Sequence, residues 1–166
     1  MRIIIKLSKD QIKLARDLAT KRNAKSARFG SKTYNDKHKS EDVHFMGVLS
    51  ELAVALVCKT KLDTNIYNNK GDEGFDLVLP KLGRCNVKTT TYKDDPFLRV
   101  EVNKFKECVD SYILCVWDKN KSKEVQIIGY ATKMDILKAP QKRLMRYGPL
   151  NYILTEKDLK SLKVVA

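Results

Sequence analysis

The sequence predicts one α/β domain over residues 1–166, with helices before and after a central mixed β-sheet. Two helical segments, one amphipathic and one strongly apolar, occupy much of the first 60 residues. Short segments with strand character then follow one another from about residue 75 to residue 131. A chain of 166 residues is long enough for a sizeable core, and two full domains are not expected.

Composition and charge indicate a folded protein with a polyanionic partner. Apolar residues make up 43% of the chain, and no apolar run is long enough to cross a bilayer. The apolar stretch at the N-terminus is too short for a secretory signal, so we expect a soluble protein of the cytoplasm, or of the host cytoplasm if the chain is viral. The 33 Lys and Arg stand against 20 Asp and Glu, and the net charge of +13 favours nucleic acid over an anionic membrane.

The cysteines argue against a zinc site and against a disulfide framework. Zinc ligands usually occur in close pairs, and none of the four cysteines forms a Cys-x-x-Cys pair with another. Each lies in an apolar stretch, which is typical of reduced, buried thiols in a cytosolic protein. They are Cys58, Cys85, Cys108 and Cys115.

The N-terminal part contains a predicted strand and two predicted helices. Residues 2–7 have strand character, and Ser8 and Gln11 have the spacing of a capping box that starts the first helix. The apolar face of that helix consists of Ile12, Ala15, Leu18 and Ala19. Ser40 is the predicted N-cap of the second helix, which reaches about residue 58. This helix is apolar nearly all round, so we expect it to pack on more than one side.

Residues 20–39, between these helices, are predicted to form a mobile basic loop. Seven Lys and Arg stand there against one acid, Asp36, and the segment has neither helical nor strand periodicity. Aromatic residues are interleaved with the charges, which favours contacts to nucleic-acid phosphates and bases. A solvated loop without a partner is the alternative. The loop's predicted contacts to nucleic acid are Lys21, Arg22, Lys25, Arg28 and Lys32.

The second half of the chain has the pattern of strands joined by polar turns. The predicted strands are 75–79, 84–92, 97–102, 111–117, 125–131 and 151–154, with a weak candidate at 65–68. The apolar run 111–117 is typical of a central strand buried on both faces. Short helices are predicted at 134–138 and, after a Thr155 cap, at 156–162. A second basic cluster, predicted to contact nucleic acid, comprises Lys138, Lys142, Arg143 and Arg146.

Polar side chains interrupt the apolar elements at a few positions. Glu51 lies in the middle of the apolar helix, where an unpaired carboxylate would be costly to bury. Asp76 interrupts the strand 75–79, and a hairpin would bring it close to Asn86 and Lys88, which share one face of the next strand. Oxygen ligands beside a lysine suit Mg²⁺ and a phosphate substrate, which is the set that phosphodiester hydrolysis needs.

Each of these residues also has an ordinary structural explanation. Glu51 could pair with Lys59 or with an arginine of the basic loop. Asp76 could end a turn, and Lys88 could be an edge-strand lysine that discourages aggregation. Their occurrence together, on one helix and two strands, favours a site.

Three stretches resemble the motifs of the PD-(D/E)XK nuclease superfamily. They are Gly47–Ala53, Gly74–Leu77 and Asn86–Thr90, and the resemblance covers about residues 41–137. It implies a restriction-endonuclease-like core, in which a central mixed sheet is flanked by helices. It also implies an enzyme that binds divalent metal and cuts nucleic acid. The basic loop and the small core suggest that a phage or mobile element encodes the chain.

The resemblance assigns roles to individual residues. Glu51 and Asp76 would be metal ligands, the Val87 carbonyl a further ligand, and Lys88 the group that positions the attacking water. One position departs from the superfamily pattern, because Asn86 stands where the pattern has an acid and is the weaker ligand. The acids available as substitutes are Asp72, Glu73 and Glu101, and Thr90 is a candidate phosphate contact.

The leading hypothesis is therefore a DNA nuclease that depends on Mg²⁺, with Mn²⁺ as the other candidate ion. The alternative is a non-catalytic nucleic-acid-binding protein that keeps the nuclease fold, and Asn86 is the residue that favours it. Strandedness, sequence preference, and endonucleolytic or exonucleolytic cutting stay open. A homodimer would suit an enzyme that cuts both strands of a duplex.

Overall fold

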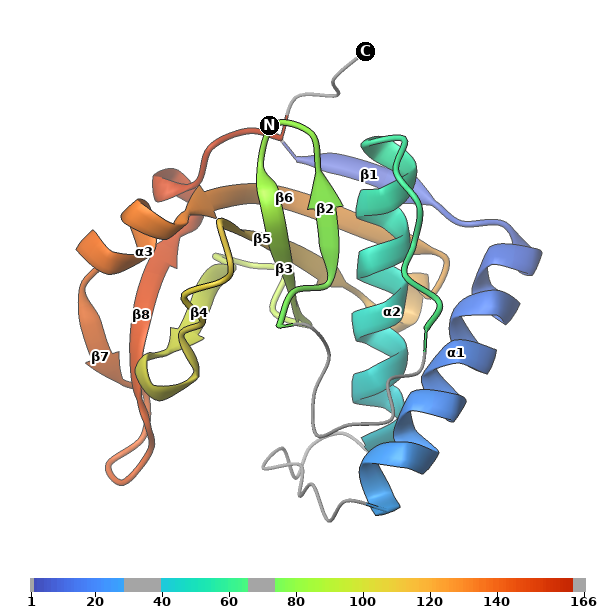
Figure 1. The fold of residues 1–166 in the computed structure, drawn as a ribbon, viewed down its shortest axis with the longest axis horizontal. Coiled ribbons are helices and arrows are strands. Elements are labelled where there is room, and N and C mark those ends of the chain that lie inside the picture. Colours follow the sequence, from blue (N-terminus) through green and yellow to red (C-terminus); the bar gives the residue numbers. More distant parts are fainter. Residues whose placement is uncertain (1, 29–39, 66–73, 163–166) are drawn as a thin grey trace.

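The computed structural model describes residues 2–28, 40–65 and 74–162, and Figure 1 shows their arrangement. Two sheets organise the chain: a five-stranded mixed sheet in the order β1–β6–β5–β3–β2 and a three-stranded sheet in the order β4–β8–β7. The helices are α1 (Lys9–Arg28), α2 (Ser40–Val57) and α3 (Lys133–Lys138), with short 3₁₀ turns η1 (Val102–Lys104), η2 (Lys119–Lys121) and η3 (Glu156–Asp158). The strands are β1 (Ile3–Lys6), β2 (Leu77–Leu79), β3 (Gly83–Thr90), β4 (Phe97–Glu101), β5 (Ser111–Trp117), β6 (Glu124–Thr132), β7 (Gln141–Arg143) and β8 (Leu150–Thr155).

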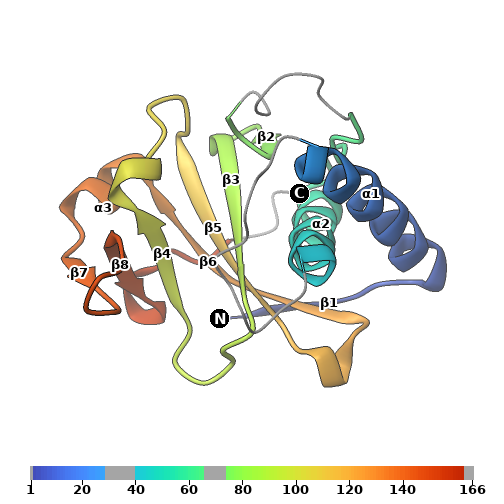
Figure 2. The same ribbon diagram turned by 90° about the horizontal axis from the view of Figure 1, so that it is seen from below.

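The elements form three layers. Figure 2 shows α1 and α2 on one side of β3, β5 and β6, with β4, β7, β8 and α3 on the other side. Within the larger sheet β3 runs parallel to β5, and the remaining strand pairs are antiparallel. The predicted α/β class, a mixed sheet flanked by helices, is therefore confirmed.

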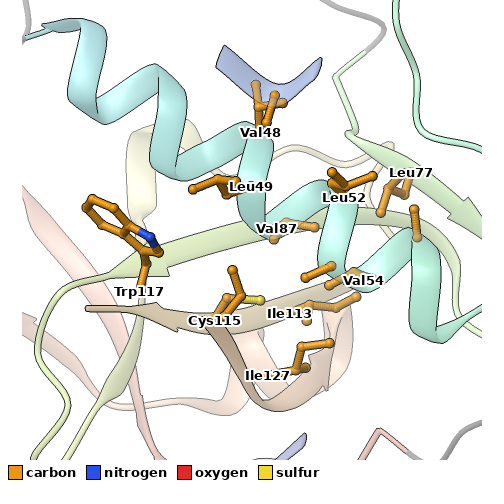
Figure 3. Packing of buried hydrophobic residues seen from close by; sticks show 14 of the residues in the cluster. Val48, Leu49, Leu52, Val54, Leu77, Val87, Ile113, Cys115, Trp117 and Ile127 are labelled. Atoms are coloured by element: carbon orange, nitrogen blue, oxygen red, sulfur yellow. The ribbon is translucent and has the colours of Figure 1, made fainter. Parts of the chain in front are cut away.

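Strand β5 separates two hydrophobic cores, because all seven of its residues are buried. Ile113 and Cys115 belong to the core under the helices, whereas Tyr112 and Leu114 belong to the core shared with the smaller sheet. Figure 3 shows the first of these cores, in which side chains of α2 lie against those of β3, β5 and β6. The predicted two-sided strand is confirmed.

Helix α1 begins at the predicted capping box and ends later than predicted. The N–H of Gln11 donates to Ser8 Oγ (3.2 Å), and the N–H of Ser8 donates to Gln11 Oε1 (2.8 Å). The helix continues to Arg28, so residues 20–28 are its last turns and the prediction of a loop there is wrong. Lys, Arg and Ala dominate these turns and are good helix formers, whatever their net charge. Residues 29–39, including Lys32, lie outside the described residues.

The C-terminal segment differs from the prediction in two places. Thr155 caps only the 3₁₀ turn η3, and the predicted helix 156–162 does not form. The chain instead pairs Lys160 with Tyr130 of β6 through two backbone hydrogen bonds of 2.9 Å. Gly129 permits this approach, because a Cβ there would lie 2.6 Å from the Lys160 carbonyl oxygen. The second basic cluster, earlier in the chain, contains the short strand β7. This strand was not predicted, because its three residues are polar and exposed.

The four cysteines are free thiols. Cys85 and Cys115 are buried, and burial raises the pKa of each thiol to about 12. Cys58 and Cys108 are half-buried.

Among the residues that the structure describes, no helix has the length and apolar character needed to cross a membrane.

Candidate functional site

The β2–β3 hairpin fixes Asp76 against the next strand. Its register pairs Leu77 with Cys85, and Gly83 makes the turn possible with a φ of +69°. The N–H of Asp76 donates to the Cys85 carbonyl (2.8 Å), and the N–H of Val87 donates to Asp76 Oδ2 (2.6 Å). The prediction that a hairpin brings Asp76 to the strand of Asn86 and Lys88 is confirmed.

Asn86, Lys88 and Thr90 lie on the face of β3 that points away from the helices. Cys85 and Val87 belong to the core under α2, and successive residues of a strand point to opposite faces. Asn86 is 7% exposed, and within the described part of the chain its Oδ1 atom has no hydrogen-bond partner. Buried amide oxygens are normally paired, so this atom is a candidate ligand position.

The ammonium group of Lys88 is held in surroundings that disfavour its charge. Burial lowers the pKa of Lys88, and the nearby carboxylate of Asp76 opposes this shift. The charges of Lys106 and Lys104 lower the pKa further, and Glu101 raises it. A perturbed lysine beside a fixed carboxylate is a frequent property of catalytic sites.

We expect Lys88→Met to raise the free energy of unfolding at about pH 7, because the apolar side chain is not penalised by burial as the ammonium group is. The lowered pKa means that the folded state disfavours the charged form of Lys88. At a pH below the folded-state pKa of Lys88, the charged side chain therefore lowers the free energy of unfolding of the wild type. This loss of stability disappears as the pH rises through the folded pKa towards the unfolded value.

Urea denaturation at about pH 7 and about pH 10 measures this difference. The stabilisation by Lys88→Met should shrink at the higher pH, whereas the exposed control Lys119→Met should change stability at neither pH. Destabilisation by Lys88→Met at about pH 7 would contradict the expectation.

Glu51 is paired with Arg22 in the helical layer. Arg22 Nη1 donates to Glu51 Oε1 (3.1 Å) and Oε2 (2.9 Å), and Arg22 Nη2 donates to the Asp63 carbonyl (3.0 Å). The Glu51 side chain is 10% exposed. Burial, and next the charge of Arg22, lower the pKa of His44 on the same helix. The alternative interpretation, that Glu51 pairs with an arginine of the basic segment, is therefore confirmed, and Arg22 has an internal partner rather than a free surface position.

The structure brings Asp76, Asn86 and Lys88 together and leaves Glu51 with Arg22. Across residues 2–24, 42–65 and 74–162, no three His, Cys, Asp or Glu side chains are grouped closely enough to hold a metal ion. Asp72 and Glu73 lie outside the described residues. Glu101 does act on Lys88, but it forms an ion pair with Lys104 (2.9 Å).

The candidate nucleic-acid contacts lie in different parts of the molecule. Lys21 is exposed on α1, and the side chains of Lys25 and Arg28 are outside the described set. Thr90 Oγ1 accepts from the N–H of Tyr92 (3.2 Å), which gives Thr90 a role in the turn after β3. Three of the four residues of the second basic cluster lie on the β7–β8 hairpin, and these are Lys142, Arg143 and Arg146.

Lys104 and Lys106 were missed by the sequence reasoning. They flank Phe105 in the connection from β4 to β5, and both act on Lys88. One feature of the sequence could have pointed to them. The two lysines lie two positions apart, just before β5, and β5 is the strand that pairs with β3. Their positive charges make the Lys88 side of the sheet suitable for a phosphate group.

Comparison with known proteins finds no relative of the chain. The chain matches no family model, and no curated protein and no solved structure is similar to it at a significant level. A function for the chain therefore has to be inferred from the residues around Asp76 and Lys88.

Proposed function

We propose that the protein is a Mg²⁺-dependent nuclease that hydrolyses phosphodiester bonds of DNA on a restriction-endonuclease-like core. The observation that supports this most is the placement of Lys88, half-buried and with a lowered pKa, beside an Asp76 carboxylate fixed by the Val87 N–H at 2.6 Å. Two further lysines act on the same group, and the chain as a whole carries a net charge of +13.

The residues on this face fit a divalent ion that is held jointly with a phosphate. Asp76 would supply the negative charge, and the buried Asn86 Oδ1, without a partner among the described residues, would supply a neutral oxygen. The Val87 carbonyl is the proposed further ligand. Mg²⁺ is usually bound through one or two carboxylates and completes its shell with water and phosphate oxygens. When bound, the ion would lower the pKa of a water and stabilise negative charge on the phosphate.

Besides the ion, the proposed reaction uses the side chain of Lys88. Its ammonium group would donate to a phosphate oxygen and so stabilise the charge that develops during hydrolysis. Asp76 would hold Lys88 in place by attraction, as the opposing effect of Asp76 on the pKa of Lys88 indicates. The same ammonium group would position the attacking water beside the phosphate.

Glu51 joins such a site only if Arg22 releases it. Both Glu51 oxygens accept from Arg22 in the conformation described here. We therefore propose Asp76 as the principal ligand and Glu51 as a ligand that depends on the Arg22 contact.

A titration of Mg²⁺ and Mn²⁺ against supercoiled plasmid and circular single-stranded DNA tests the proposal. We expect cleavage at millimolar Mg²⁺, more efficient cleavage with Mn²⁺, and none in EDTA, because the described donors hold a single ion weakly. Failure to cut either substrate with any divalent ion, together with no metal binding by calorimetry, would overturn the proposal.

A non-catalytic nucleic-acid-binding protein is the second candidate. It is favoured by the neutral Asn86 and by the pairing of Glu51 with Arg22, which leave few carboxylates for an ion. Such a protein would bind DNA equally well in EDTA and in Mg²⁺ and would cut it in neither.

Asn86→Asp separates the two candidates. In a nuclease the added carboxylate should lower the Mg²⁺ concentration needed for half-maximal cleavage and keep or raise the rate. In a non-catalytic protein it should leave cleavage absent and lower the melting temperature without metal, because a second carboxylate would lie near Asp76. The control Asn120→Asp makes the same chemical change on the exposed turn η2 and should alter neither quantity. An unchanged Mg²⁺ requirement in a cleaving Asn86→Asp enzyme would remove Asn86 from the ion site.

A further inference from the structure

The loop between β7 and β8 presents large apolar side chains to solvent. We call residues 144–147 the hairpin tip; in it Leu144 is 45% exposed, Met145 69% and Tyr147 88%. Figure 1 shows this loop extending away from the rest of the molecule beside β4. Adjacent exposed apolar side chains of this size usually mark an interaction site.

The hairpin tip is held in place by specific contacts. The N–H of Gly148 donates to the Met145 carbonyl (3.0 Å), and Arg143 Nη1 donates to the Gly148 carbonyl (2.6 Å). At the base, the buried Asn151 donates from Nδ2 to the Pro149 carbonyl (2.6 Å). The side chains of the tip are therefore exposed on a turn that hydrogen bonds hold in one conformation.

The charge around the tip is complementary to a phosphate backbone. The segment from Lys138 to Leu150 contains four basic residues, Lys138 included, and no acid. The Arg146 guanidinium lies over the Tyr147 ring, 5.4 Å from its centroid. Exposed aromatic rings among Lys and Arg are typical of surfaces on which the bases of single strands stack while phosphates contact the charges.

The hairpin also continues the surface of the candidate site. A shallow depression of about 320 Å³ is lined by Val102 and Asn103 of η1 and by Arg143, Pro149 and Leu150 of the hairpin. Lys104, the third residue of η1, acts on Lys88. A strand lying along the hairpin would therefore reach η1, of which Lys104 is the last residue.

We propose that the hairpin tip binds unpaired nucleotides of single-stranded DNA, with Tyr147 stacking on a base, Met145 packing against a base by van der Waals contact, and Lys142 and Arg146 contacting phosphates. This inference rests on the proposed function and names the form of substrate that the enzyme holds beside its site. The duplex is disfavoured for the tip, because paired bases offer no free faces to a side chain.

Fluorescence anisotropy in EDTA tests the inference without cleavage. The probes are an oligothymidylate of about twenty nucleotides, an abasic strand of the same length, and a duplex of that length. Tyr147→Ala should weaken binding to the oligothymidylate at least about fivefold, and Tyr147→Phe should restore it, because stacking needs the ring and not the hydroxyl. Binding to the abasic strand and to the duplex should change less than about twofold.

Met145→Ala has a matched control in Met134→Ala, an equally conservative change at another exposed methionine, 57% exposed on α3. Only Met145→Ala should weaken oligothymidylate binding. Equal losses on all three probes, or no loss with Tyr147→Ala while the wild type binds and cuts DNA, would overturn the inference and leave the proposed function standing. Concentration-dependent self-association that Tyr147→Ala abolishes would instead assign the tip to a second copy of the chain. A wild type that binds no probe would overturn both.

Discussion

Asp76→Ala is expected to lower the rate of DNA cleavage by at least about a hundredfold, while DNA affinity in EDTA changes little. The substitution removes the carboxylate proposed to hold the ion and the partner that attracts Lys88, and losses of this size are usual when a charge-stabilising group is removed. Single-turnover cleavage at saturating Mg²⁺ measures the effect, and anisotropy on the same DNA measures binding.

Asp76→Asn distinguishes the chemical role of this residue from its structural role. The amide keeps an oxygen that can accept from the Val87 N–H, so the hairpin should keep its stability, whereas Asp76→Ala leaves that buried donor without its partner. We therefore expect both variants to lose cleavage and only Asp76→Ala to melt at a lower temperature. Full activity of Asp76→Asn would mean that the catalytic site lies elsewhere in the molecule.

Arg22→Met is expected to lower the free energy of unfolding by about 3 kcal/mol, whereas substitutions of surface residues usually change it by less than about 0.5 kcal/mol. The substitution removes the guanidinium that balances the buried carboxylate of Glu51, and breaking one half of a buried ion pair is strongly destabilising. Chemical denaturation at about pH 7 measures the loss.

Glu51→Gln in the Arg22→Met background should recover much of the lost stability, because it removes the unbalanced charge. A double-mutant cycle over the two positions gives the coupling free energy directly. Lys21→Met, one residue earlier and exposed, is the control and should change stability by less than about 0.5 kcal/mol. Equal stabilities for Arg22→Met and Lys21→Met would contradict the ion pair. The cycle is also needed before any loss of cleavage in Glu51 variants is assigned to metal binding.

The elements that could be predicted are those whose own residues determine their conformation. The capping box of Ser8 and Gln11, the hairpin between Asp76 and Asn86 and the apolar run of β5 are all local patterns, and each was predicted correctly. The error at residues 20–28 came from treating the lack of apolar periodicity as evidence of a loop, although several of the residues are good helix formers. The error after Thr155 has another cause, since Lys160 pairs with a strand that is distant in the sequence.

The same distinction, between local patterns and contacts of residues distant in the sequence, applies to the candidate site. Asp76, Asn86 and Lys88 are joined by a tight hairpin, so their proximity follows from strand pairing across a short turn. The position of Glu51 depends on how α2 packs on the sheet and on which basic residue of α1 reaches it, and no periodicity in the sequence contains that information. Lys104 and Lys106 likewise come to Lys88 through the arrangement of two separate sheets.

The burial of β5 on both faces determines how the molecule can be dissected. The core under α1 and α2 and the core under the smaller sheet each take alternate side chains of this one strand. A fragment that ends before β5 would keep α1 and α2 but expose the apolar side chains with which they pack on β5 and β6. A fragment that starts after β5 would keep β6, β7 and β8 without their central support. Neither the part that carries Glu51 nor the part that carries the β7–β8 hairpin can therefore serve as a minimal unit, and studies of either part need the whole chain.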